Sequence, residues 1–95
     1  MKTTLINLQE RFEAGAYGDV VREWHLQDQQ IGSDPEIAFV VAASFFRIGD
    51  NTKAQEICEQ IEGPFQNHVN FLAMYAAILR RQGLYERADK IFQKA

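Results

Sequence analysis

Three glycines recur at one fixed interval along this chain of 95 residues. Gly15, Gly49 and Gly83 lie 34 residues apart, in the contexts FEAGAYGDVVREW, FRIGDNTKAQEIC and RRQGLYERADKIF. Five positions after each glycine stands a short apolar residue, and nine positions after it stands a larger or sulfur-containing one; the two sets are Val20, Ala54, Ala88 and Trp24, Cys58, Phe92. A constant period of this length predicts repeated structural units that stack on one another.

The apolar residues before the second and third glycines have helical spacing. They stand eleven, eight, seven and four positions before the glycine, as Ala38, Val41, Ala42, Phe45 and as Leu72, Tyr75, Ala76, Leu79. Offsets of three, four and seven place these side chains on one face of a helix. Each unit is therefore predicted to be a helix, a glycine turn and a second helix. We expect helices over residues of about 3–14, 17–30, 35–48, 51–62, 68–82 and 85–95.

The small residues and the helix ends fit this division. Two helices approach closely where both side chains are short, so we expect Ala42 to meet Ala54, and Ala76 to meet Ala88. A glycine ends a helix readily, because it adopts the left-handed conformation without strain. Pro35 suits the first turn of a helix. The residues expected to cap the following helices are Asp34, Asp50 or Asn51, and Asn67.

Composition and charge favour one helical domain and exclude several functions. Hydrophobic residues make up 46% of the chain and charged residues 24%, which is typical of a globular protein. Ten basic and thirteen acidic residues give a net charge of −3, which disfavours a nucleic-acid partner. No apolar run approaches the roughly 20 residues of a membrane span, and no signal-peptide core is present. With the single cysteine Cys58, these features predict a cytoplasmic protein with no membrane partner.

The repeat resembles the tetratricopeptide repeat (TPR), a pair of helices with the same period, a small-residue face, a turn glycine and an alanine soon after it. The resemblance covers the chain as units 1–34, 35–68 and 69–95, which together form one domain. It implies an all-α fold, an α-solenoid of three helical hairpins wound in a right-handed superhelix. In the first unit Asn7 and Arg11 stand where the other units have apolar residues, which indicates a rotated helix face.

In tetratricopeptide proteins the first helix of each unit lines a concave groove that binds a partner's peptide or helix. The matching positions from which we expect binding are Phe39, Val40, Ala43, Phe46, Arg47, Asn70, Met74, Ala77 and Arg81. Further matching positions are Glu36, Ala73 and Arg80, and in the first unit Lys2, Leu5, Ile6, Gln9, Phe12 and Glu13. The family's carboxylate clamp for chaperone tails is absent, because its positions hold Leu5, Gln9, Val40, Asn70 and Met74. The expected groove is apolar with an arginine rim, suited to an amphipathic helix or an apolar segment beside acidic residues.

Several alternatives stay open at this point. Phe39, Val40 and Met74 can instead be covered by neighbouring helices of the same chain. At the chain's end, Leu84, Ile91 and Phe92 would form an apolar strip, covered by the rest of a longer chain or by a second copy in a homodimer. The alternative function is a structural or dimerisation segment that orients a downstream domain, which can be an enzyme, as in many bacterial multidomain proteins.

Residues suited to catalysis are few and scattered. His25 and His68 fall in different units, and no pair of His or Cys residues has metal-binding spacing. By register Cys58 is a buried hydrophobic residue and Trp24 belongs to the core. The glutamates at three-residue spacing, which are Glu56, Glu59 and Glu62, form a solvated helix face. We therefore expect no enzymatic activity, no metal and no cofactor.

Overall fold

A computed structural model describes residues 5–27 and 35–94 of the chain, and all regular structure in these residues is helical. The helices are α1 (Leu5–Glu13), α2 (Tyr17–Gln27), α4 (Pro35–Arg47), α5 (Asn51–Ile61), α6 (Val69–Arg81) and α7 (Tyr85–Lys94). These bounds agree with the expected helices, and the all-α class is confirmed. The predicted cap Asp34, the predicted start of the first helix and the predicted ends of the second and last helices lie outside the described residues.

The three repeated glycines form three equivalent turns. Gly15, Gly49 and Gly83 have φ angles of 82°, 91° and 80°, the left-handed conformation that glycine adopts without strain. In each turn the backbone amide of the residue after the glycine donates a hydrogen bond to the carbonyl of the residue four positions before the glycine. The N···O distances are 2.8 to 2.9 Å, and the pairs are Ala16 to Arg11, Asp50 to Phe45 and Leu84 to Leu79. This bond closes the end of each helix by supplying a partner for an otherwise free carbonyl.

Two helix starts show which residues act as caps. The carboxylate of Asp50 accepts a hydrogen bond from the Lys53 amide at 3.1 Å, which resolves the choice between Asp50 and Asn51. The prediction that Asn67 caps the next helix is wrong. Nδ1 of His68 accepts from the Phe71 amide at 3.2 Å, and the extended backbone of His68 places the helix start one residue later than expected.

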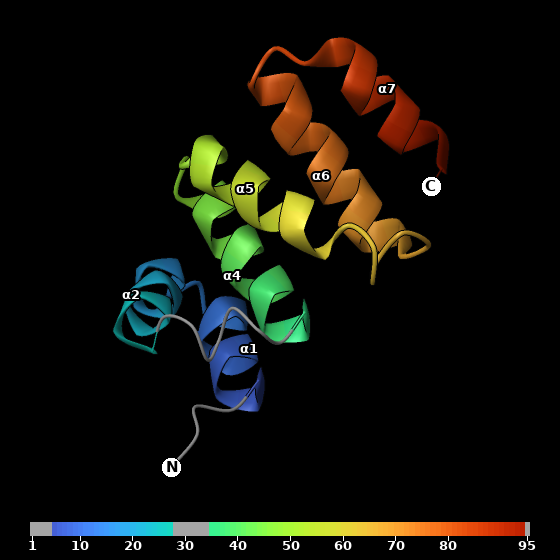
Figure 1. The fold of residues 1–95 in the computed structure, drawn as a ribbon. Helices are drawn as coiled ribbons and strands as arrows, with labels where there is room; N and C mark the ends of the chain where they lie inside the picture. Colours follow the sequence, from blue (N-terminus) through green and yellow to red (C-terminus); the bar gives the residue numbers. More distant parts are fainter. Residues whose placement is uncertain (1–4, 28–34, 95) are drawn as a thin grey trace.

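The helices form three successive pairs arranged in chain order along the molecule, which measures 41 × 24 × 22 Å (Figure 1). Within the pairs, α1 contacts α2, α4 packs along α5, and α6 packs along α7. Helix α4 also contacts α1, α2 and α6, while α5 contacts α6. Helix α4 is therefore the central element. None of the described helices combines the length and apolar character needed to cross a membrane.

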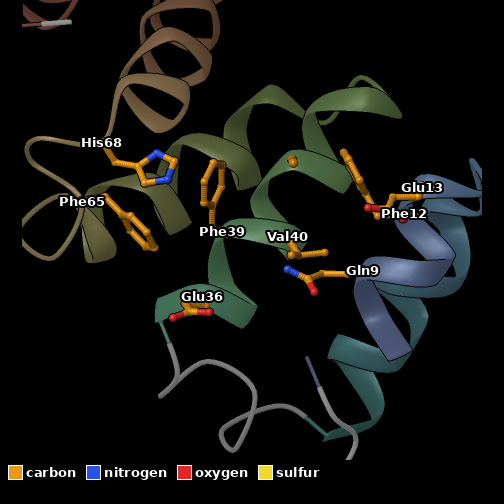
Figure 2. Close-up of a pocket in the computed structure, with 9 residues that line it drawn as sticks. Gln9, Phe12, Glu13, Glu36, Phe39, Val40, Phe65 and His68 are labelled. Carbon is orange, nitrogen blue, oxygen red and sulfur yellow. The ribbon is translucent and has the colours of Figure 1, made fainter. Parts of the chain in front are cut away.

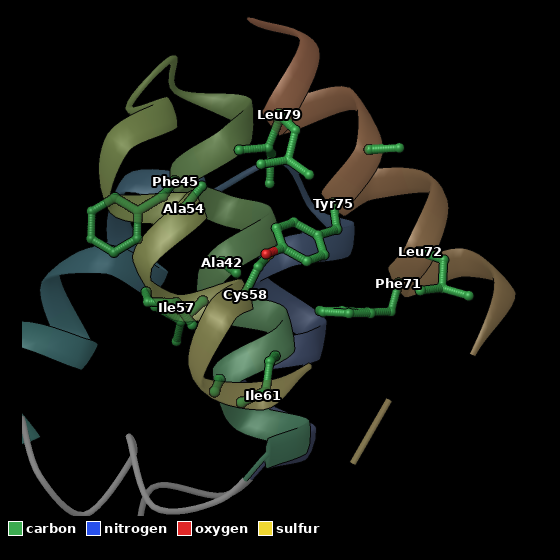
Figure 3. Close-up of a cluster of buried hydrophobic side chains, with 14 of the residues drawn as sticks. Ala42, Phe45, Ala54, Ile57, Cys58, Ile61, Phe71, Leu72, Tyr75 and Leu79 are labelled. Carbon is green, nitrogen blue, oxygen red and sulfur yellow. The ribbon is translucent and has the colours of Figure 1, made fainter. Parts of the chain in front are cut away.

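One hydrophobic core connects the pairs (Figure 3). Ala42 and Ala54 are buried in the second pair, and Ala76 and Ala88 in the third, which is compatible with the expected close approach of the paired helices. The side chains nine residues after each glycine differ more in their burial. They are fully buried Cys58, partly buried Trp24, and Phe92, which remains 65% exposed.

A polar cluster fastens α5 to the third pair. Arg87 donates to the Tyr75 hydroxyl at 3.0 Å and lies 3.4 Å from the Glu59 carboxylate. The Tyr75 hydroxyl in turn donates to Glu62 at 3.5 Å, and Lys94 pairs with Glu62 at 3.9 Å. Two of the three glutamates predicted to be a solvated face thus also join neighbouring helices.

Candidate partner-binding pocket

A pocket of about 530 Å³ lies between α1, α4 and the connection from α5 to α6. Figure 2 shows its lining side chains, which come from all three segments and surround one hollow. The lining residues are Gln9, Phe12, Glu13, Glu36, Phe39, Val40, Ala43, Phe65 and His68. This volume lies within the range of small-molecule and side-chain binding pockets.

Helical spacing explains why α1 and α4 contribute these residues. Positions three, four and seven residues apart lie along one face of a helix, which applies to Glu36, Phe39, Val40 and Ala43 of α4. The buried face of the same helix is formed by Ile37, Ala38, Val41, Ala42, Ser44 and Phe45. Helix α4 is therefore apolar on both faces. One face enters the core and the other lines the pocket.

Phe39 and Val40 are neither fully exposed nor fully covered. Both are partly buried and pack against the core. The Phe39 ring lies 5.2 Å from the Phe65 ring, 5.4 Å from His68 and 5.7 Å from Phe71, measured between centroids. Neighbouring aromatic residues thus hold Phe39 in place while it still lines the pocket.

Phe65 and His68 are pocket residues that sequence reasoning missed. Both belong to the segment GPFQNHV, which was interpreted as a break between units. Residues 62–67 fold into turns, and the Phe65 ring stacks on Phe71 with centroids 5.4 Å apart. The feature of the sequence that could have indicated this role is Phe65 itself, a large apolar residue in an otherwise polar connection.

Six of the nine residues from which binding was expected lie outside this pocket: Phe46, Arg47, Asn70, Met74, Ala77 and Arg81. The Arg81 guanidinium lies 4.9 Å from the centroid of the Phe46 ring, and that of Arg47 lies 6.0 Å from the Tyr17 ring. Asn70 is exposed, while Met74 is partly buried against the core. Ala77 lines a separate pocket of about 240 Å³ between α6 and α7, together with Ala73, Ala76, Arg80, Ala88, Asp89 and Phe92.

The apolar strip expected at the end of the chain is only partly present. Leu84 is 36% exposed and Phe92 is 65% exposed, and Tyr85 beside them is 60% exposed. Ile91 is buried at 7% exposure, so the expectation that it belongs to an exposed strip is wrong. Its register equivalent Ile57 is buried as well, because both side chains turn into the core.

The residues considered for catalysis take part in contacts within and between the helices. The exposed His25 lies beside Trp24, with ring centroids 5.0 Å apart, and His68 caps α6. Cys58 is fully buried, and burial raises its pKa to about 12, so the thiol is kept in its unreactive protonated form. Among the residues that the structure describes, no group of three or more His, Cys, Asp or Glu could hold a metal ion.

Comparisons with family models, with curated proteins and with solved structures found no match to this chain.

Proposed function

We propose that this chain is a TPR-like interaction module that binds a peptide or an amphipathic helix of a protein partner in the pocket between α1 and α4. The proposed α-solenoid is supported by the 34-residue period and by the three glycine turns, which share φ angle and hydrogen bonding. The module acts by binding and carries out no reaction itself. Its proposed location is the cytoplasm.

One observation carries this proposal. The repeat register assigned eleven positions of α1 and α4 to the concave side of the solenoid, and seven of these line one pocket: Gln9, Phe12, Glu13, Glu36, Phe39, Val40 and Ala43. Apolar side chains dominate its walls, which suits an anchoring side chain of an extended or helical segment. Partly buried aromatic anchors in a preformed pocket are typical of strong contacts in protein interfaces.

A pocket-filling substitution tests the site without removing a contact. Random peptides displayed on phage are selected for binding to the wild-type chain. The affinity of the selected peptides is then measured for the Ala43→Phe variant and for the matched control Ala73→Phe. Ala43 lines this pocket, while Ala73 lines the smaller pocket between α6 and α7. We expect Ala43→Phe to weaken binding at least about tenfold and Ala73→Phe to leave it unchanged. Loss of binding only in Ala73→Phe would contradict the proposed site.

A second candidate function is self-association or the docking of a downstream domain. The observation in its favour is the exposure of Leu84, Tyr85 and Phe92 on the third helical pair. Molar mass measured by light scattering at increasing concentration tests the homodimer, which should dissociate on dilution. A constant monomer mass would contradict self-association.

A further inference from the structure

The charged side chains that line the pocket are both acidic. They are Glu13 at the end of α1 and Glu36 in the first turn of α4, and Figure 2 shows them on different sides of the hollow. The other polar side chains around the pocket are Gln9 and His68. Lysine and arginine are absent from the described lining residues.

The arginines of α1 and α4 are directed toward α2. Arg11 lies 3.9 Å from the carboxylate of Glu23, and Arg47 lies over the ring of Tyr17. Both partners belong to α2. The two helices that build most of the pocket therefore each place one glutamate at the pocket and their arginines away from it.

The helix dipoles make the two acidic positions unequal. Glu13 is the last residue of α1, where the negative pole of the helix adds to the charge of the carboxylate. Glu36 lies at the positive pole of α4, which offsets part of its charge. The Glu13 end of the pocket thus attracts a cation more strongly than the Glu36 end.

We infer that the pocket binds a protein segment in which an aromatic or branched aliphatic side chain stands next to a lysine or arginine. The apolar side chain packs among Phe12, Phe39, Val40 and Phe65, and the cation pairs with the carboxylate of Glu13. The chain's net charge of −3 favours the approach of such a basic segment. This inference rests on the proposed function and reverses the expectation, drawn from the sequence, of a partner with acidic residues.

Three synthetic peptides with one apolar centre test the charge preference. Their flanking residues are lysine in the first, glutamine in the second and glutamate in the third, and their affinities are measured by fluorescence anisotropy. We expect the lysine peptide to bind about fivefold tighter than the glutamine peptide at low ionic strength, with the glutamate peptide weakest. Added salt should reduce these differences, because it screens exposed charges.

Paired charge-neutralising variants locate the effect. Glu13→Gln with Glu36→Gln should remove the preference for the lysine peptide, so that the lysine and glutamine peptides bind this double variant with equal affinity. The control is Glu10→Gln with Glu86→Gln, which removes the same charge from α1 and from the first turn of α7, outside the pocket. The control should keep the preference. Circular dichroism of both double variants verifies that the helices remain folded.

The outcomes separate this inference from the proposed function. Equal binding of all three peptides, or a preference for the glutamate peptide, would overturn the charge assignment and leave apolar binding intact. Failure of all three peptides, with no peptide recovered from the phage library, would overturn both. A concentration-dependent dimer that is lost in Phe92→Ser and blocks the lysine peptide would assign the pocket to a second copy, which also overturns the inference.

Discussion

The ring of Phe39 on α4 packs edge-on against the ring of Phe65, with centroids 5.2 Å apart and planes at 64°. This contact joins the first helix of the second pair to the connection that leads into the third pair. Both rings line the pocket. The shape of the pocket therefore depends on a residue that lies in a turn and outside every helix.

The first prediction concerns this aromatic pair. Phe65→Ala removes the contacts of its ring with Phe39 and Phe71, and it should lower the free energy of unfolding by about 2 kcal/mol. A double-mutant cycle with Phe39→Ala should give a coupling energy of about 1 kcal/mol in urea denaturation. The control Phe92→Ala, at a ring that is 65% exposed, should change stability by less than about 0.5 kcal/mol. Additive effects of the two pocket substitutions would refute the coupling.

The second prediction uses one substitution at two glycines. An added Cβ would meet no atom within 4 Å at either Gly49 or Gly18, so only the backbone conformation distinguishes them. Gly49 has a φ of 91°, and Gly49→Ala should destabilise the fold by about 1 kcal/mol because of left-handed strain. Gly18 is a helical position of α2, and Gly18→Ala should stabilise by about 0.5 kcal/mol. Thermal unfolding measures the change in stability of both variants. Changes of the same sign at the two glycines would refute the role of the backbone conformation.

The third prediction concerns the cap of α5. Asp50→Ala removes the acceptor for the Lys53 amide and should lower stability by about 1 kcal/mol. Asp50→Asn keeps an acceptor at the same place and should stay within about 0.5 kcal/mol of the wild type. Hydrogen exchange at the Lys53 amide should be faster in the alanine variant alone. Similar exchange in both variants would mean that the side chain does not cap the helix.

The fourth prediction is a loss of stability at alkaline pH. Burial raises the pKa of Cys58 from 9.0 to about 12, and burial together with the Glu62 carboxylate raises that of Tyr75 from 10.0 to about 12. Because both groups ionise more easily in the unfolded chain, their contribution is fully present below about pH 9 and is lost between about pH 9 and 12. Each group should contribute a slope of up to about 1.4 kcal/mol per pH unit above its unfolded pKa.

Urea denaturation across this pH range checks the slope. Cys58→Ala removes the contribution of the thiol, so its stability should begin to fall only near pH 10, the ordinary pKa of Tyr75. Identical profiles for this variant and the wild type would show that the Cys58 thiol does not ionise more readily on unfolding.

The helices and their turns could be predicted from the sequence because their signals are local. A glycine at the end of an apolar helical pattern marks a left-handed residue, and all three marked glycines have positive φ. The small residues expected where the paired helices meet, which are Ala42, Ala54, Ala76 and Ala88, are buried. Within the described residues, the repeat register also brings together Phe39, Val40 and Ala43 at one pocket.

The remaining features depend on contacts between distant segments. The position of Phe65 follows from its stacking on Phe71 and Phe39, which no local pattern predicts. His68 replaces Asn67 as the cap because the turns of residues 62–67 end one residue later than the composition suggests. The placement of the arginines also depends on such contacts, since Arg81 stacks over Phe46 and lies outside the pocket.

An amide chemical-shift map is the measurement that tests the pocket most directly. The isotope-labelled chain is titrated to saturation with the lysine-flanked peptide, and shifts are assigned along the sequence. We expect the largest shifts within residues 9–13 of α1, 36–43 of α4 and 65–68 of the connection, the three segments that contain the pocket-lining side chains. Largest shifts around Phe92 of α7, or no shifts at saturating peptide, would contradict it.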